Sequence, residues 1–431
     1  MPFELSARPP RRIAVIGGGI SGMAAAYLLA ETDSVTLVEG AARLGGHART
    51  VIAGRRGDQP VDTGFIVFNR VNYPHLARLF DRLGVPVADS DMSFGVSIDG
   101  GRIEYGLASL STIFTQRRNA LRPRFLGMLR DILRFNRLAP GLCGDPGLTI
   151  GGLIELTGGG DWFRDYYLTP LSGAIWSTPT RGILDFPART MIEFLRNHAL
   201  LDYSEKHRWL TVRGGSIQYV RRLERHLLSA GVEIATGSPV VALRRSPAGV
   251  ELRRQGGEWE RFDEVVLATH SDDSLRLISD ATPEERQTLA AIRYQPNTAI
   301  LHADASVMPR RRGAWSSWVY TEERGARPDA ISLTYWMNSL QPIPRDDPMF
   351  VTLNPVRPIR DELIYDQTIF RHPVYDLAAI AAQERLRATN GRGGLWFCGA
   401  WMRNGFHEDG FASAVDVVQA MSRLRERRLV A

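Results

Sequence analysis

The sequence predicts an α/β protein in which a domain with a parallel sheet is interleaved with a mixed α+β domain. Three observations lead to this prediction: a strand, a glycine turn and a helix near the N-terminus; a second strand that ends in an acidic residue; and strand-like runs that resume after residue 205 and again near the C-terminus. The length of 431 residues is enough for two or three domains.

The first strand is expected at Ile13–Ile16 and the first helix at Ser21–Ala30. Gly17, Gly19 and Gly22 lie at their junction with the spacing G-x-G-x-x-G. The first glycine of this motif permits the tight turn, the second lets a pyrophosphate approach the backbone, and the third lets the helix pack closely on the strand. The helix start at Ser21 supplies amide donors and a partial positive charge to a phosphate.

A second strand, Ser34–Val38, ends in Glu39. A carboxylate at this offset from the glycine turn can accept hydrogen bonds from the hydroxyls of an adenosine ribose. The glycine triplet alone is a weak signal, but together with Glu39 it predicts a dinucleotide site on a Rossmann-like domain.

Charge and cysteine content exclude other classes of protein. The net charge of +6 is too small and too dispersed to indicate nucleic-acid binding. Two cysteines, Cys143 and Cys398, give no disulfide framework and favour a reducing compartment. Arg11 and Arg12 precede an apolar stretch, as in a twin-arginine signal, but the glycine spacing favours a first strand and helix. We expect a cytoplasmic protein, possibly membrane-associated, without a metal site.

The residues after Glu39, "AARLGGHART", place Arg43, Gly45 and Gly46 in the order R-x-G-G. Here the chain resembles the flavin amine oxidase superfamily, which includes monoamine oxidases, protoporphyrinogen oxidase and phytoene desaturases. The resemblance implies that this loop holds the pyrophosphate of FAD. His47 stands where a second arginine is usual, so His47, Arg49 or neither contacts phosphate.

"VDTGFIVFN" matches the V-D-x-G segment of the superfamily, which implies that Gly64, Phe65 and Ile66 run beside the flavin ring. By the same resemblance, the backbone of Val240 contacts adenine. Members that attach FAD covalently carry a cysteine before the last strand, and residues 365–376 contain none. The resemblance therefore implies non-covalent FAD.

The predicted fold is a Rossmann-like FAD-binding domain of the amine-oxidase type, interleaved with a mixed α+β substrate domain. Both domains are discontinuous in sequence. The FAD domain is expected at residues 1–88, 206–270 and 376–431, and the substrate domain at 89–205, mainly helical, and 271–375, mainly sheet.

Near the C-terminus, a strand at Leu395–Cys398 is followed by Gly399 and Ala400, where many relatives have a carboxylate in the second position. Gly405, Phe406 and His407 then resemble the start of the closing helix of the superfamily, which faces the pyrimidine end of FAD. The acids at 408 and 409 are typical of helix N-terminal caps. His407 is a candidate to relay a proton near neutral pH.

Two departures from the superfamily point away from an amine substrate. Amine oxidases commonly use a lysine near the flavin, and the chain has a single lysine, Lys206. They also commonly have a tyrosine at the position of Phe406, and an apolar wall suits a hydrocarbon better. We therefore assign the candidate catalytic positions to Phe406 and His407.

"VDTGFIVFNRVNYPHLARLFDRLGV" and "NGFHEDGFASA" resemble bacterial FAD oxidoreductases related to the oxidase-like N-terminal region of plant cyclopropane fatty acid synthases and to the desaturase of furan fatty acid formation. This implies an FAD-dependent desaturase that removes hydride from methylated or unsaturated acyl chains of membrane phospholipids. The alternatives are an amine or small-molecule oxidase, a carotenoid-type desaturase or isomerase, and a flavin-binding partner of a lipid methyltransferase without turnover of its own.

Residues 114–138 combine bulky apolar residues with arginines at helical spacing. The residues expected on one face are Phe125, Leu129, Ile132 and Leu133, and those on the other are Arg130, Arg134 and Arg137. Such a helix either lies in a lipid headgroup layer or packs its apolar face inward as part of a cap.

Overall fold

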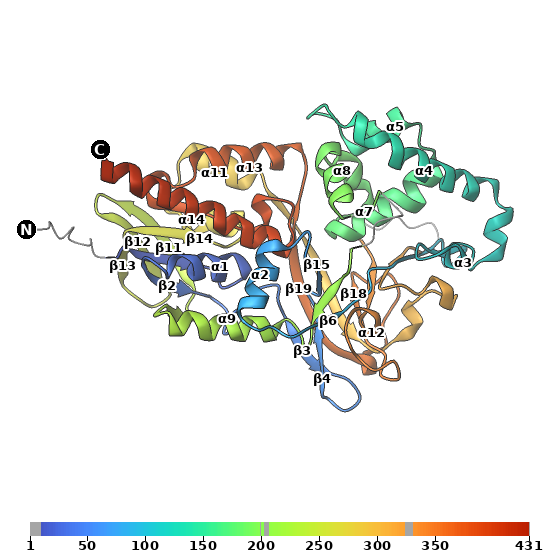
Figure 1. Ribbon diagram of the computed structural model, residues 1–431, viewed down its shortest axis with the longest axis horizontal. Coiled ribbons are helices and arrows are strands. Elements are labelled where there is room, and N and C mark those ends of the chain that lie inside the picture. The colour runs from blue at the N-terminus through green and yellow to red at the C-terminus, as the bar shows by residue number, and fades with distance from the viewer. Residues whose placement is uncertain (1–9, 199, 202–206, 324–330, 431) are drawn as a thin grey trace, which may run out of the picture. The chain divides into compact units, whose positions relative to one another are not determined.

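The structure is a computed structural model that describes residues 10–198, 200–201, 207–323 and 331–430 (Figure 1). The chain forms two compact units, each assembled from separate segments. Unit 1 comprises Met1–Ala48, Tyr219–Ile292 and Ala381–Ala431, and unit 2 comprises Arg49–Gln218 and Arg293–Ile380. The first boundary lies at residue 48, whereas the sequence placed it at 88, because the strands that follow Ala48 pair within unit 2.

Unit 1 is built on a five-stranded parallel sheet in the order β10-β2-β1-β14-β20. Its strands are β1 (Arg12–Ile16), β2 (Ser34–Val38), β10 (Glu233–Ala235), β14 (Glu264–Leu267) and β20 (Leu395–Phe397). The central strands are apolar along their length, and Ile13, Ala14 and Val15 are completely buried. Strands covered on both faces are typical of such α/β sheets.

The helices of unit 1 come from all three of its segments. They are α1 (Ile20–Leu29), α9 (Ile217–Ser229), α10 (Ser271–Leu277), α11 (Pro283–Ala290), α13 (Leu377–Thr389) and α14 (His407–Val430), of which α9 and α13 begin in unit 2. An antiparallel sheet adds β11 (Val240–Ser246), β12 (Gly249–Arg254) and β13 (Trp259–Phe262). Helices α1 and α14 lie side by side (Figure 1), because small residues on α1 allow close packing.

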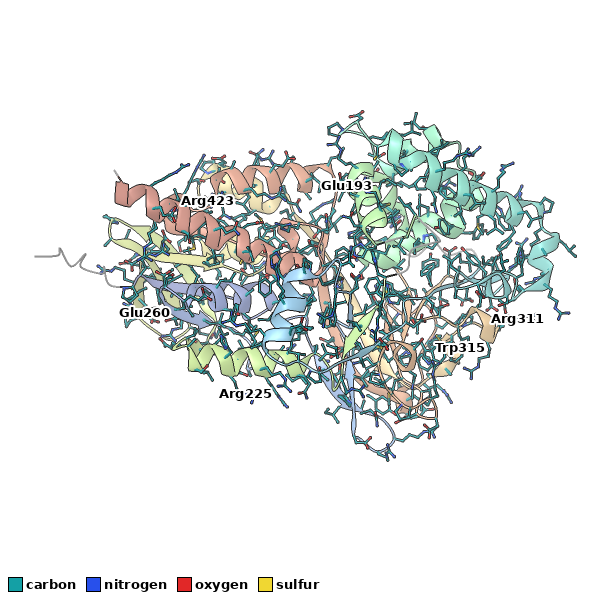
Figure 2. The ribbon with its side chains drawn as sticks, viewed as in Figure 1. Glu193, Arg225, Glu260, Arg311, Trp315 and Arg423 are labelled. Atoms are coloured by element: carbon teal, nitrogen blue, oxygen red, sulfur yellow. The ribbon has the colours of Figure 1, made fainter. Side chains whose placement is uncertain are left out.

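Unit 2 contains a seven-stranded sheet in the order β19-β15-β18-β17-β16-β7-β8. Its strands are β7 (Phe94–Ile98), β8 (Ile103–Gly106), β15 (Arg293–His302), β16 (Trp318–Thr321), β17 (Leu333–Trp336), β18 (Phe350–Leu353) and β19 (Ile364–Val374). Trp315, labelled in Figure 2, packs edge-on against Trp336 and Phe350 at one hydrophobic cluster of this sheet. Strand β17 ends at Trp336, and Met337 begins a short helix.

Smaller sheets and helices complete unit 2. The strands are β3 (Thr50–Ala53), β4 (Gln59–Asp62), β5 (Val67–Phe68), β6 (Val87–Asp89) and β9 (Leu210–Val212). The helices are α2 (Pro74–Arg82), α3 (Leu110–Ile113), α4 (Pro123–Leu142), α5 (Ile150–Thr157), α6 (Asp161–Phe163), α7 (Thr169–Trp176), α8 (Ala188–Asn197) and α12 (Met337–Leu340). The region expected to be helical between 89 and 205 is therefore helical from α3 to α8 after the β7–β8 hairpin.

Helix α4 packs its inner face on the rest of unit 2. Phe125, Ile132 and Phe135 are buried, and the ring of Phe125 meets that of Tyr105 edge-on. The expectation that Leu133 shares this face is wrong, because its side chain is 61% exposed. Leu133 is eight residues after Phe125, which on an α-helix places its side chain about 80° around the axis from that of Phe125.

In the part of the chain that the structure describes, every helix is too short or too polar to cross a membrane.

Candidate functional site

The glycine turn of unit 1 joins β1 to α1 at the carboxyl end of the sheet. Gly17 has φ +108°, a conformation that glycine adopts without strain, and its amide donates to the carbonyl of Val38 at 2.8 Å. A Cβ atom at Gly22 would collide with the carbonyl oxygen of Gly17. The close contact between helix and turn therefore requires glycine at position 22.

The N-terminus of α1 follows this turn directly. The helix begins at Ile20 with Gly19 at its N-cap, and none of the described side chains caps it. The nearest atom to a Cβ built on Gly19 is the Cα of Gly46, 4.0 Å away. Amides at a helix N-terminus that no side chain caps fit a phosphate group. The residues present therefore fit the pyrophosphate of a dinucleotide.

Glu39 lies at the end of β2 and is held by two backbone amides. Its carboxylate accepts from Gly18 at 2.6 Å and from Ala41 at 2.7 Å. The carbonyl of Glu39 also accepts from the amide of Ser238 at 3.0 Å, so the segment leading to Val240 runs beside it. Glu39 and Val240, which the sequence assigned to the two halves of an adenosine, therefore lie in the same part of unit 1.

The second glycine loop packs on the first. The amide of Gly45 donates to the carbonyl of Gly18 at 2.8 Å, and a Cβ on Gly46 would stand 3.0 Å from the Cα of Gly19. The guanidinium of Arg43 donates to three carbonyls of its own loop, those of Leu44, Gly46 and Ala48, at 2.9 to 3.1 Å. Arg43 thus fixes the shape of the loop, which is a supporting role for a pyrophosphate site.

His47 and Arg49 have different surroundings. The half-buried ring of His47 lies 5.9 Å from that of His270, between ring centroids, within unit 1. Arg49 belongs to unit 2 and makes a bidentate ion pair with Asp366 at 2.6 and 2.9 Å. That pair occupies the guanidinium of Arg49, so of the two candidates left open by the sequence His47 is the one that lies in the nucleotide-binding unit.

His270 also belongs to a small group with Asp272 and Asp273, whose ligand-type atoms lie within 4.8 Å of one another. Both carboxylates form ion pairs with Arg276. The group is a charge-compensated helix start, and it gives no independent sign of a metal ion.

The C-terminal strand and helix return to the glycine turn. The amide of Gly399, directly after β20, donates to Ser413 Oγ at 2.9 Å. A Cβ on Gly410 would stand 2.8 Å from atoms of Ile20 and Ser21, so the first turn of α14 packs against the first turn of α1. Two helix N-termini are thereby brought together, and Ala400 follows Gly399 without a carboxylate of its own.

Asp409 caps the start of α14. Its carboxylate accepts from the amide of Phe406 at 2.9 Å, and burial raises its pKa to about 6. Gly405, with φ +94°, makes the turn that precedes this start. The expectation of an ordinary N-terminal cap is therefore confirmed for Asp409, whereas the neighbouring Glu408 is buried.

His407 forms a hydrogen bond with Tyr219, a residue that the sequence did not single out. The Tyr219 hydroxyl and His407 Nε2 are 2.6 Å apart. Burial, together with nearby His47, lowers the pKa of His407 to about 3. The imidazole is thus neutral at pH 7, in contrast to the expectation of a group that titrates near neutral pH. Tyr219 is the third residue after the "RGGS" turn, and only the fold brings it to His407.

The V-D-x-G segment, with Gly64, Phe65 and Ile66, belongs to unit 2 and is anchored there on both sides. The carbonyl of Ile66 accepts from Thr211 Oγ1 at 2.8 Å. Asp62 is completely buried and accepts from the hydroxyl of Thr50 at 2.6 Å and from the amide and hydroxyl of Ser216. Asp62 therefore anchors this segment, a role that was not predicted from its place in the V-D-x-G motif.

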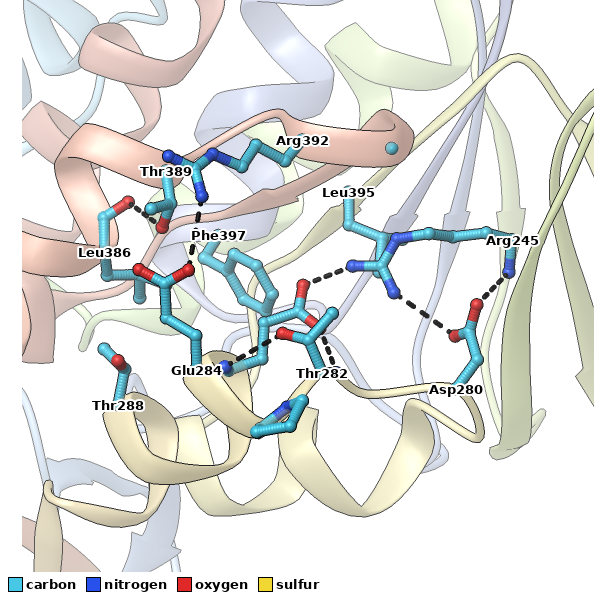
Figure 3. A pocket seen from close by; sticks show the side chains of 13 residues that line it. Arg245, Asp280, Thr282, Glu284, Thr288, Leu386, Thr389, Arg392, Leu395 and Phe397 are labelled. Atoms are coloured by element: carbon cyan, nitrogen blue, oxygen red, sulfur yellow. Dashed lines mark hydrogen bonds and ion pairs between the residues drawn. The ribbon is translucent and has the colours of Figure 1, made fainter.

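A cavity of about 680 Å³ lies elsewhere in unit 1 (Figure 3). Its wall includes Leu395 and Phe397, the first and last residues of β20. The residues of the glycine turn, Gly17, Gly19 and Gly22, do not line it. Its charges are also paired, Arg245 with Asp280 and Glu285. We therefore do not assign the dinucleotide to this cavity.

Lys206 lies outside the described residues.

Comparisons with known proteins agree with this geometry. Three solved structures have a TM-score of 0.66 with this chain at 14 to 15% identity: a CLA-producing fatty acid isomerase from P. acnes, cyclohexylamine oxidase from Brevibacterium oxydans, and an oxidoreductase from Methanosarcina mazei. They cover 95%, 96% and 95% of this chain, and 98%, 100% and 100% of their own chains are matched. No curated protein matches the sequence.

The family model of flavin-containing amine oxidoreductases matches residues 20–325. This span begins at the first residue of α1, so it includes Gly22 and the second glycine loop but not Gly17 and Gly19. The chain therefore belongs to the flavin-containing amine oxidoreductase family and is an FAD-dependent oxidoreductase.

Proposed function

We propose that the protein is a desaturase that removes hydride from methylated or unsaturated acyl chains of membrane phospholipids. The observation that carries this proposal is the start of α14, where Phe406 is half-buried beside a neutral His407. A phenylalanine there offers an apolar surface without a hydroxyl, which favours contact with a hydrocarbon.

FAD, when bound, would supply the oxidant by accepting hydride at N5 from one carbon, while the neighbouring carbon loses a proton to solvent and the double bond forms between the two carbons. The chain contributes the surroundings of that chemistry. The uncapped amides at the start of α1 and the glycine loops would hold the pyrophosphate, and Glu39 and Val240 the adenosine. Gly64, Phe65 and Ile66, by the resemblance of their motif, would line the flavin ring.

Tyr219 holds the imidazole of His407 in one orientation through the hydroxyl at Nε2. When that hydroxyl donates, the neutral ring carries its own proton on Nδ1 and can donate from there. The pair therefore acts as a fixed hydrogen-bonding group at pH 7 and adds no charge to the apolar surroundings of a hydrocarbon.

An amine oxidase is the second candidate, because cyclohexylamine oxidase has the same fold. The fatty acid isomerase has it too, so the fold does not distinguish the two substrate classes. The residue chemistry favours the lipid: no lysine occurs among the described residues, and a tyrosine is lacking at position 406.

The test uses the purified, FAD-loaded protein under anaerobic conditions. It is mixed with detergent-dispersed phospholipids that carry methylated or unsaturated chains, and in parallel with a panel of amines, while the absorbance of oxidised flavin is followed. Mass spectrometry then determines whether the lipid has lost two hydrogens. The variant Phe406→Tyr, which restores the usual hydroxyl, is compared with the unaltered protein.

Bleaching of the flavin by lipid alone, with a new double bond in the product, supports the desaturase, and Phe406→Tyr should then slow bleaching by lipid. Bleaching by an amine alone excludes the desaturase in favour of an amine oxidase. Lack of bleaching by either substrate favours a flavin-binding partner of a lipid methyltransferase.

A further inference from the structure

A continuous stretch of unit 2, from Tyr105 to Arg130, contains no acidic residue and five arginines. It comprises the end of β8, helix α3, a 3-10 turn at Arg117–Leu121 and the first half of α4. In Figure 1 this stretch is the connection from α3 to α4 at the edge of the unit. Such a concentration of one charge creates a local positive potential.

Three arginines converge at the 3-10 turn. Arg118 and Arg122 both donate to the backbone carbonyl of Arg102, at 2.7 and 3.2 Å. The pKa of Arg122 is lowered, first by burial and then by the positive charges of Arg118 and Arg102. Guanidinium groups that share one carbonyl repel one another, and an anion placed among them relieves that repulsion.

The acidic residues near this cluster are already engaged. Asp99 pairs with Arg102 at 3.1 Å. Glu104 is buried and accepts from the backbone amides of Arg310 and Arg311, at 2.9 and 3.0 Å. The side chains of both arginines are exposed. Figure 2 labels Arg311. The positive charge of the region therefore extends beyond the cluster itself.

Asp131, on α4, is also engaged. Its carboxylate accepts from the amide of Gly160 at 3.0 Å and pairs with Arg130 and Arg134. This buried acid is used to hold α4 to the segment before α6. It compensates part of the charge of Arg130 but does not reach the 3-10 turn.

Large apolar side chains are exposed among these arginines. Leu121, between Arg118 and Arg122 in sequence, is 84% exposed, and Leu110 on α3 is 75% exposed. On α4 the outer face alternates between leucine and arginine with helical spacing: Leu126, Arg130, Leu133 and Arg137. Exposure of several leucines to water is unfavourable in free energy, and their grouping beside arginines indicates an interaction surface.

We propose that this surface docks on an anionic phospholipid bilayer, with the leucines entering the acyl boundary and the arginines binding lipid phosphates. We name it the arginine–leucine face and define it by the following residues: Arg102, Leu110, Arg117, Arg118, Leu121, Arg122, Arg124, Leu126, Arg130, Leu133 and Arg137.

The mixture of residues selects a bilayer as the occupant. Free phosphate would engage the guanidinium groups of Arg118 and Arg122 but would leave Leu121 and Leu126 in water. A bilayer surface satisfies both, because it presents phosphates above an apolar layer and long arginine side chains reach back to the headgroups. The charge complementarity is direct, since arginines near an anionic leaflet each contribute to binding.

The docking proposal does not require that the protein be a lipid desaturase. The assay therefore uses vesicles of fully saturated lipid, which lack the double bond that the proposed reaction needs. If the protein binds the saturated vesicles but lipid does not reduce its flavin, only the proposed function is excluded. If lipid reduces the flavin but the protein does not bind the vesicles, only the docking surface is excluded.

The FAD-loaded protein is sedimented with large vesicles of saturated phosphatidylcholine, with or without phosphatidylglycerol as the anionic lipid, at low and high salt. We expect binding to the anionic vesicles alone, weakening as salt screens the phosphates. Inorganic phosphate at the same ionic strength as the added salt should compete better than chloride, because it engages the arginines, but it should not abolish binding, because the leucine contacts are not available to it.

Single variants distinguish the contribution of the arginine charges to vesicle binding from that of the leucine contacts. Arg118→Ala and Arg122→Ala are each expected to weaken partitioning about fivefold. Leu121→Ser should weaken it as well, and high salt should not abolish that difference, because the loss is hydrophobic. The matched controls are Arg225→Ala on α9 and Arg423→Ala on α14, two exposed arginines outside the face (Figure 2).

Three results would overturn the proposal. These are equal binding to vesicles with and without phosphatidylglycerol, absence of binding to either, and losses in the control variants as large as those in the face. Far-ultraviolet circular dichroism of each variant establishes that it is folded, and because Leu121 and Leu126 are exposed their replacement should leave the fold intact.

Discussion

Tyr219 and His407 lie 188 residues apart in sequence and share a hydrogen bond of 2.6 Å between the phenol hydroxyl and Nε2. The tyrosine is completely buried on α9, and its ring meets the imidazole edge-on at 5.7 Å between centroids. The contact joins the second and third segments of unit 1. It also places a fixed, neutral imidazole at the start of α14.

Tyr219→Phe removes only the hydroxyl. We expect a decrease in the rate of flavin reduction of about tenfold, because a hydrogen bond that orients a group near the reacting atoms contributes about 1 to 1.5 kcal/mol. The dissociation constant of FAD, measured by flavin fluorescence, should change little. A large loss of FAD with an unchanged rate of reduction would instead indicate that Tyr219 supports the cofactor site as a whole.

His407 should remain neutral down to about pH 3. In the unfolded chain its pKa is near 6.5, so between these values the unfolded state binds the extra proton and the free energy of unfolding rises with pH, by up to about 1.4 kcal/mol per pH unit. The stabilising contribution is complete above pH 6.5. NMR of labelled histidine measures the pKa directly, and His407→Gln should flatten the pH dependence of stability. A midpoint near 6.5 would show that the ring is solvated.

Local sequence patterns were sufficient to predict the strand, turn, helix and second strand at the start of unit 1. The strand over Ser34–Val38 is confirmed residue by residue, and the glycine spacing located the turn before α1, because both depend on neighbours in sequence. The partner of His407 could not be predicted, since it depends on how α9 and α14 approach. For the same reason the neutral state of the imidazole was missed: burial, which lowers its pKa, is a tertiary property.

Gly22→Ala should prevent a stable nucleotide turn. The added Cβ meets the backbone carbonyl of Gly17, which cannot move without breaking the turn, so we expect loss of FAD binding and at least about 3 kcal/mol of destabilisation. Gly127→Ala on α4 is the matched control. Nothing lies within 4 Å of its Cβ and its φ is ordinary, so it should be neutral or stabilise by about 1 kcal/mol. Thermal unfolding and flavin retention distinguish the two, and equal effects would contradict this packing.

Glu39→Gln tests the adenosine end of the site. The variant keeps the shape but replaces one carboxylate oxygen with an NH₂ group, which cannot accept from Gly18 or Ala41. We expect FAD affinity to fall by about tenfold or more, equivalent to about 1.4 kcal/mol, because a charged acceptor is lost. Glu31→Gln, an exposed acid near the end of α1, is the control. Unchanged affinity in Glu39→Gln would remove the assigned role of this carboxylate.

Asp62→Asn tests the anchor of the V-D-x-G segment in unit 2. The Asp62 carboxylate accepts from Thr50 and from both the amide and the hydroxyl of Ser216, and an asparagine would turn a donor toward one of them. We expect destabilisation of about 1 to 3 kcal/mol at pH 7, measured by thermal or denaturant unfolding. Asp58→Asn, in the exposed loop of the same hairpin, should change stability by less than about 0.5 kcal/mol.

The pH dependence of the same variant separates the charge of Asp62 from its hydrogen bonds. Burial raises the pKa of Asp62 from 3.8 to about 6, so between these values the folded state binds the extra proton. Its contribution to stability is complete below pH 3.8 and is lost as pH rises through 6, by about 3 kcal/mol in total. Asp62→Asn cannot titrate, so the difference in unfolding free energy between the variant and the unaltered protein should change over this window. A constant difference from pH 4 to pH 7 would mean that the hydrogen bonds of Thr50 and Ser216 keep the carboxylate ionised throughout.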